Sequence, residues 1–126
     1  MNKPEKFSWR KRAKAFKYAK EGARALLQYE HNFRIHLCAA VIVVILGFIF
    51  SISPIEWCVI LLCIGGVFCA EGLNSALEVL CDRISTQQDE AIKRAKDIAA
   101  ASVFFLAFAA LIIGLIIFIP KLMNLL

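Results

Sequence analysis

Charged residues are absent from long parts of this sequence, and their absence excludes an ordinary soluble domain. Residues 35–52, 57–70 and 98–119 contain no Asp, Glu, Lys or Arg, and 60% of the chain is hydrophobic, above the roughly 45–50% of soluble domains. A helix crosses the hydrocarbon of a bilayer with about 20 mostly apolar residues. We therefore predict an all-α membrane protein whose transmembrane helices cover residues 35–52, 55–81 and 98–119.

The common catalytic motifs are also missing. The sequence has no GxxxxGK[ST] phosphate-binding loop and no serine in a nucleophile elbow. The five cysteines lie in the predicted spans without the spacing of metal ligands or redox pairs, and we interpret them as small apolar residues of the membrane core. Gly65-Gly66, in the middle of a span, is expected to allow close helix packing.

Positive charge is concentrated beside two of the span ends. Ten of the fifteen Lys and Arg residues lie in residues 1–34, and four more lie around residues 82–97, whereas the turn at 51–56 has none. Cytoplasmic segments carry such an excess. We predict that the N-terminus and the 82–97 connection lie in the cytoplasm and that the turn at 51–56 and the C-terminus face the other side. The basic residues flank the membrane, which favours contact with anionic lipid headgroups over nucleic acid binding.

Residues 7–34 are predicted to form one amphipathic helix within a single domain of residues 1–126. Its apolar positions recur at helical spacing, and its charged positions step by three or four on another side. Such a helix lies in the membrane interface; the alternative is a solvated basic flank that only sets orientation. The basic, polar start also gives no sign of a signal peptide. At the far end, Pro120 is predicted to end the third span.

A row of polar side chains interrupts the second span. Glu71, Asn74 and Glu78 are spaced i, i+3 and i+7, and Asp82 continues the row, so a helix places them on one face. The rise of a helix separates Glu71 from Glu78 by roughly 10 Å. A charged side chain inside a bilayer costs at least a few kcal/mol, so such residues usually line a polar site.

Further charges are predicted at the same membrane face. Glu30 and Arg34 precede the first span, and Lys93, Arg94, Lys96 and Asp97 precede the third. Carboxylates bind divalent metals, cations neutralise phosphate oxygens, and a further carboxylate can accept a proton from a hydroxyl. The spacing alone leaves three interpretations open: a phosphoryl-transfer site, the pathway of a small ion-coupled transporter, or structural ion pairing in a noncatalytic scaffold.

The segment Glu71-Gly-Leu-Asn-Ser-Ala-Leu-Glu-Val-Leu-Cys-Asp82 resembles the signature of the small bacterial integral-membrane diacylglycerol kinase family, which includes undecaprenol kinases. Residues 30–36, 95–97 and 114–121 resemble other segments of that family, so the likeness covers roughly residues 8–121. Cys81 departs from the valine or alanine expected at its position, although it keeps a small side chain.

The resemblance implies an ATP-dependent lipid kinase of the bacterial inner membrane that works as a homotrimer with active sites shared between subunits. By position, Glu71 is the general base, and Glu30 and Glu78 are ligands of Mg²⁺, with Asn74, Arg34 and Asp82 in supporting places. The implied nucleotide contacts are Lys11, Tyr18, Glu30, Glu78, Gln87, Gln88, Asp89, Lys96 and Asp97. The family often has arginine in place of Lys11, and the loop over residues 87–89 matches in place but not in residue type.

The same resemblance favours undecaprenol over diacylglycerol as the lipid acceptor. Residues 32–36, the Glu56-Trp57 pair and the ending over residues 114–121 look more like the undecaprenol kinase branch. The branch that acts on diacylglycerol tends to have glutamate at the position of His36. Diacylglycerol remains the alternative acceptor, because both lipids offer a primary alcohol.

Overall fold

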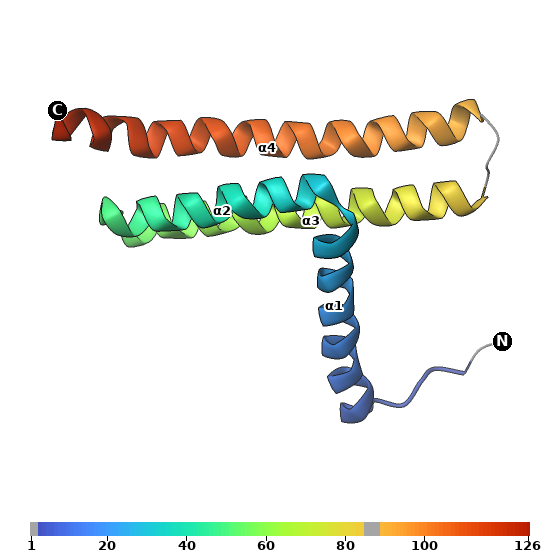
Figure 1. Ribbon diagram of the computed structural model, residues 1–126. Helices are drawn as coiled ribbons and strands as arrows, with labels where there is room; N and C mark the ends of the chain where they lie inside the picture. The colour runs from blue at the N-terminus through green and yellow to red at the C-terminus, as the bar shows by residue number, and fades with distance from the viewer. Residues whose placement is uncertain (1–2, 85–88) are drawn as a thin grey trace.

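The computed structural model describes residues 3–84 and 89–126, which form four helices. These are α1 (Trp9–Tyr29), α2 (His31–Ile49), α3 (Pro54–Ile84) and α4 (Glu90–Leu125). Helices α2, α3 and α4 run alongside one another, and α1 projects sideways from them (Figure 1). The last three are long and apolar enough to cross a membrane, as the apolar runs predicted.

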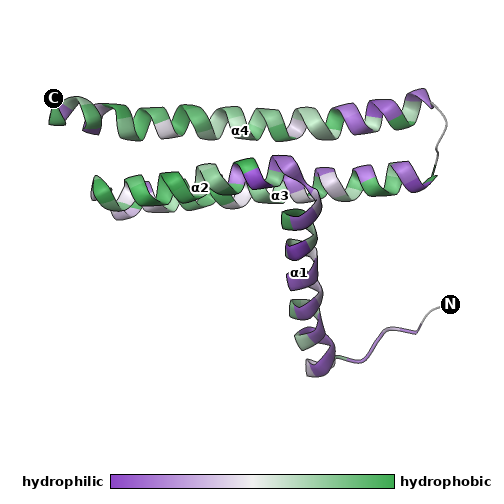
Figure 2. Cartoon of the chain, in the orientation of Figure 1, coloured by the Kyte–Doolittle hydropathy of each residue, from purple (hydrophilic) through white to green (hydrophobic). Residues whose placement is uncertain are grey.

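Helices α3 and α4 are longer than a bilayer requires. They contain 31 and 36 residues, and so measure about 46 and 54 Å, against roughly 30 Å of hydrocarbon. Their polar ends meet at the α3–α4 connection, beyond the point where α1 joins α2 (Figure 2). Residues 82–84 and 90–97, which belong to the segment predicted as a connection, are helical, because the two helices continue past the membrane-spanning length.

The helix predicted over residues 7–34 is two helices, α1 and α2, that meet at Glu30. The Glu30 backbone is extended, with φ −112° and ψ 109°. The Arg34 side chain donates hydrogen bonds from Nε to the Leu27 carbonyl at 2.6 Å and from Nη2 to the Gln28 carbonyl at 2.5 Å. The last carbonyls of a helix have no partner within it. Arg34 therefore stabilises the sharp turn between α1 and α2.

At the other end of the bundle, α4 is tied to the start of α3. The Ser53 amide donates to Glu56 Oε1 at 2.9 Å and the Glu56 amide donates to Ser53 Oγ at 3.2 Å, which is a capping box. The prediction that Pro120 ends the third span was wrong, since α4 continues to Leu125 with this proline inside it. That extra turn brings Lys121 Nζ within 3.2 Å of Glu56 Oε1.

Close contacts between the spanning helices occur at small residues and aromatic rings. A Cβ atom added to Gly66 would lie 3.2 Å from a methyl group of Leu106, whereas one added to Gly65 would meet nothing within 4 Å. The expected close packing therefore involves Gly66 and not its neighbour. The rings of Phe33 and Phe68 lie 5.1 Å apart and join α2 to α3. These contacts join α2 and α4 to α3 shortly before its polar stretch.

Candidate active site

Glu71 is the most buried carboxylate of the polar row on α3. Its side chain is 3% exposed, and its Oε1 lies 3.4 Å from Nε2 of His36, whose side chain is 24% exposed. Glu71 lies on the face of α3 that is turned toward α2. Because α2 begins just after Glu30, His36 lies beside Glu71 along the length of α3. The sequence predicted a role for Glu71 but not this contact, because no short-range pattern links two residues so far apart in the chain.

The next turn of α3 buries two further polar side chains. Asn74 is 8% exposed and Ser75 is 5% exposed. Among the described residues, neither Asn74 Oδ1 nor Ser75 Oγ has a hydrogen-bond partner. Leaving such a group unpaired costs about 1–3 kcal/mol, and an unpaired group of this kind calls for an explanation such as a bound ion or ligand. Ser75 was not predicted as a site residue, although its place beside Asn74 in the signature was a usable signal.

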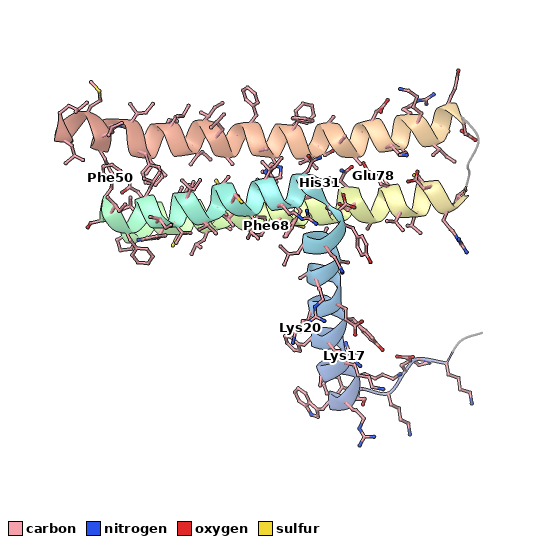
Figure 3. All side chains as sticks on the ribbon, viewed as in Figure 1. Lys17, Lys20, His31, Phe50, Phe68 and Glu78 are labelled. Atoms are coloured by element: carbon pink, nitrogen blue, oxygen red, sulfur yellow. The ribbon has the colours of Figure 1, made fainter. Side chains whose placement is uncertain are left out.

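Glu30 and Glu78 lie near enough to Glu71 to interact electrostatically with its carboxylate. Both side chains are half-buried, and Glu78 lies near the level at which α1 joins α2 (Figure 3). Within residues 3–84 and 89–126, no group of three or more His, Cys, Asp or Glu side chains is arranged to hold a metal ion. Mg²⁺ commonly binds through one or two carboxylates together with substrate phosphates and water, so the pair suits that ion when nucleotide supplies the rest.

One basic side chain, that of Lys96, joins α4 to α3 on the connection side of this carboxylate group. Lys96 Nζ lies 2.7 Å from Asp82 Oδ1 and also interacts electrostatically with Glu78. Asp97 instead pairs with Lys93 at 2.7 Å on an exposed face of α4. Lys96 therefore lies with the carboxylates of α3, and its contacts connect Asp82 to the region of Glu78.

Other predicted site residues do not come together with Glu71 in one chain. Lys11 and Tyr18 are exposed on α1, and Lys11 pairs with Glu5 at 3.0 Å. Along α1, the rise of the helix places Lys11 about 28 Å from Glu30. Asp89 Oδ1 accepts hydrogen bonds from the amides of Ala91 and Ile92, at 2.8 and 3.3 Å, and so caps α4. Gln87 and Gln88 lie outside the described residues.

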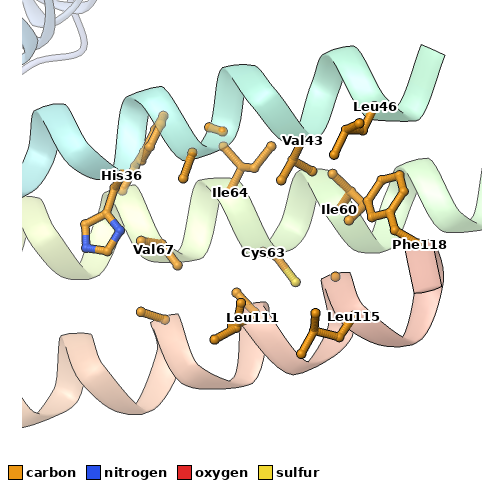
Figure 4. A pocket seen from close by; sticks show the side chains of 16 residues that line it. His36, Val43, Leu46, Ile60, Cys63, Ile64, Val67, Leu111, Leu115 and Phe118 are labelled. Carbon is orange, nitrogen blue, oxygen red and sulfur yellow. The ribbon is translucent and has the colours of Figure 1, made fainter. Parts of the chain in front are cut away.

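An apolar groove of about 430 Å³ runs between α2, α3 and α4 from the level of Glu71. His36 lies at one end of it and Phe118 at the other (Figure 4). Small residues line much of its length, among them Ala39, Ala40 and Ala110. Its lining on α2 extends from His36 to Leu46, a helical rise of about 15 Å, or half the hydrocarbon thickness. His36, which lines one end of the groove, contacts Glu71, so the groove ends beside the buried carboxylate.

Three characterised proteins resemble the chain over most of its length. An undecaprenol kinase of Bacillus subtilis is 44% identical over 109 residues, which cover 86% of this chain and 89% of that protein. Diacylglycerol kinases of Synechocystis sp. and Haemophilus influenzae are 34% and 35% identical, covering 88% and 79% of this chain and 64% and 82% of those proteins. A sequence profile of the prokaryotic diacylglycerol kinases matches residues 17–118. With a carboxylate-rich site on a three-span helical fold, the chain belongs to the prokaryotic diacylglycerol kinase family.

Proposed function

We propose that this protein is an ATP- and Mg²⁺-dependent kinase that phosphorylates the terminal hydroxyl of undecaprenol. The observation that carries the proposal is the position of Glu71. This buried carboxylate has an apolar groove beside it and two further carboxylates and a lysine beyond it. A lipid alcohol therefore has an apolar route to the base, and a nucleotide has charged partners on the polar side. The relative from Bacillus subtilis is named undecaprenol kinase, which supports this choice of acceptor.

In the proposed reaction Glu71 removes the proton from the lipid hydroxyl, and the resulting oxygen attacks the γ-phosphorus of ATP. The bond between that phosphorus and the bridging oxygen of ADP breaks, giving lipid phosphate and ADP. The proton remains on Glu71 until it is released to solvent. Mg²⁺ held by Glu30 and Glu78 would neutralise phosphate oxygens, and Lys96 adds positive charge on the same side. Ser75 Oγ, unpaired among the described residues, can donate a hydrogen bond to Glu71 or to a phosphate oxygen. Asn74 Oδ1, also unpaired there, can only accept one, for example from the lipid hydroxyl or from Glu71 once it is protonated.

We further propose a homotrimer in the bacterial inner membrane, with α1 and the α3–α4 connection on the cytoplasmic side. The distribution of Lys and Arg supports that orientation. The sideways course of α1 supports a position in the membrane interface (Figure 1). A shared active site would allow α1 of a neighbouring subunit to supply Lys11 and Tyr18, which lie far from Glu71 within one chain. Asp89, Asp97, Gln87 and Gln88 remain proposed nucleotide contacts.

The apolar groove is the proposed place for the chain of the lipid acceptor. Changing Ala110, which lines the groove, to Leu is expected to raise the KM for the lipid roughly tenfold, the scale of one or two misplaced methylene groups. The KM for ATP should stay the same, since the groove does not reach the polar side. Ala109→Leu is the matched control, because Ala109 is exposed on another face of α4. Equal lipid KM values for the two variants would exclude the groove.

The proposed function is tested with purified protein, labelled ATP, Mg²⁺ and a panel of lipid alcohols in mixed micelles. We expect labelled phosphate on undecaprenol at a higher kcat/KM than on diacylglycerol. Preferential labelling of diacylglycerol would overturn the choice of acceptor and leave the reaction intact. Labelling of neither lipid, by a protein that remains folded, would overturn the kinase assignment.

A further inference from the structure

His36 contacts two parts of the proposed active site. Its Nε2 lies 3.4 Å from Oε1 of Glu71, and its ring lines the end of the apolar groove nearest that carboxylate (Figure 4). The contact is longer than a typical N–H···O hydrogen bond of about 2.9 Å, but catalytic contacts are often long before substrate binds and shorten afterwards. His36 therefore lies between the proposed lipid groove and the proposed base.

The charges around Glu71 explain why such a contact matters. Glu30 and Glu78 both interact with the Glu71 carboxylate and carry charge of the same sign when ionised. The contact with His36 comes from the groove side. A donor on one carboxylate oxygen fixes the rotation of the group and leaves the other oxygen free to accept a proton. A general base must lie within about 2.6–3.2 Å of the proton donor in the productive pose, so this rotation decides whether the base can act.

We propose that His36 is a positioning residue, which donates a hydrogen bond from Nε2 to Oε1 of Glu71 and so holds the other oxygen toward the hydroxyl of a lipid in the groove. This inference rests on the proposed kinase function. It assigns His36 no contact with the transferred phosphoryl group. A misplacement of about 1 Å in an active site can cost on the order of a hundredfold in rate, so loss of the contact should act on kcat.

Three substitutions separate the hydrogen bond from the bulk of the side chain. In His36→Gln, the amide nitrogen is as many bonds from Cβ as Nε2 of histidine and can replace the donor. In His36→Asn the amide is one bond too short, and His36→Leu has no donor. His31→Leu is the matched control, because His31 is exposed at the start of α2, away from the groove. All four variants are assayed for kcat, lipid KM and ATP KM, with thermal unfolding in detergent as the check on folding.

We expect His36→Leu and His36→Asn to lower kcat by roughly ten- to a hundredfold, and His36→Gln to stay within about threefold of the wild type. The ATP KM should be unchanged throughout, and His31→Leu should match the wild type. A general loss of structure would instead affect Gln, Asn and Leu alike.

Two results would overturn the inference: wild-type kcat in all three His36 variants, or a loss in His36→Gln equal to that in His36→Asn. If His36→Leu fails to fold, the Gln and Asn variants decide, since both are polar amides that differ in reach. If the wild type is active and either result is found, only the proposed role of His36 is overturned. A folded wild type that phosphorylates no lipid in the panel overturns the proposed function and this inference with it.

Discussion

Replacing Glu71 with Gln is expected to abolish lipid phosphorylation while nucleotide binding persists. Glutamine keeps the shape of the side chain but cannot take the proton of the lipid hydroxyl, and general base catalysis is commonly worth about 10²–10⁴-fold in rate. The measurements are transfer of labelled phosphate to lipid, and nucleotide affinity by calorimetric titration of the detergent-solubilised protein.

Glu21→Gln provides the control for this substitution. Glu21 is exposed on α1 and has no place in the proposed site, so its replacement should leave turnover unchanged. Wild-type turnover in Glu71→Gln would show that another group accepts the proton. Simultaneous loss of nucleotide affinity would instead assign Glu71 to the binding of the metal–nucleotide complex.

The second large effect is expected from Glu78→Gln, which should raise the Mg²⁺ concentration required for half-maximal activity. The proposed ion has two carboxylate ligands from the protein, and the substitution removes the charge of one. A loss of only 1.4 kcal/mol in binding already corresponds to a tenfold weaker affinity, so we expect a shift of about tenfold or more. The measurement is a Mg²⁺ titration of initial rates at constant ATP.

Two further variants test whether the shift in the Mg²⁺ titration is specific to the proposed metal ligands. Glu30→Gln should shift the curve in the same direction, because Glu30 is the other proposed ligand. Glu90→Gln, in the exposed first turn of α4, should leave the curve in place. A Glu78→Gln curve that coincides with that of the wild type would contradict the assignment of Glu78 to the metal.

The parts of the fold that depend on local composition could be predicted from the sequence. Three uncharged runs predicted three spans, and the structure has three helices of suitable length and hydropathy. The spacing of Glu71 and Asn74 predicted that they share a helix face, and both side chains are buried on α3. These features follow from helical periodicity, which needs no knowledge of the neighbouring helices.

Features that depend on contacts between distant residues could not be predicted in this way. The break at Glu30 has no proline or glycine to mark it, and it is stabilised by Arg34 reaching back to the carbonyls of α1. The contact between His36 and Glu71 exists only because α2 packs on α3 at one particular height. Pro120 indicated a helix end by its local chemistry, but α4 continues past it and pairs with the start of α3 through Lys121.

The burial of Glu71 also bears on a competing acceptor, since water carries a hydroxyl group too and is far more abundant than any lipid. If Glu71 is the base, a side chain that is 3% exposed and lies beside an apolar groove has little opportunity to activate a solvent molecule. Exclusion of water protects reactive groups from such side reactions. The same geometry that admits an apolar lipid alcohol would thus limit the hydrolysis of ATP by water when the membrane contains no acceptor.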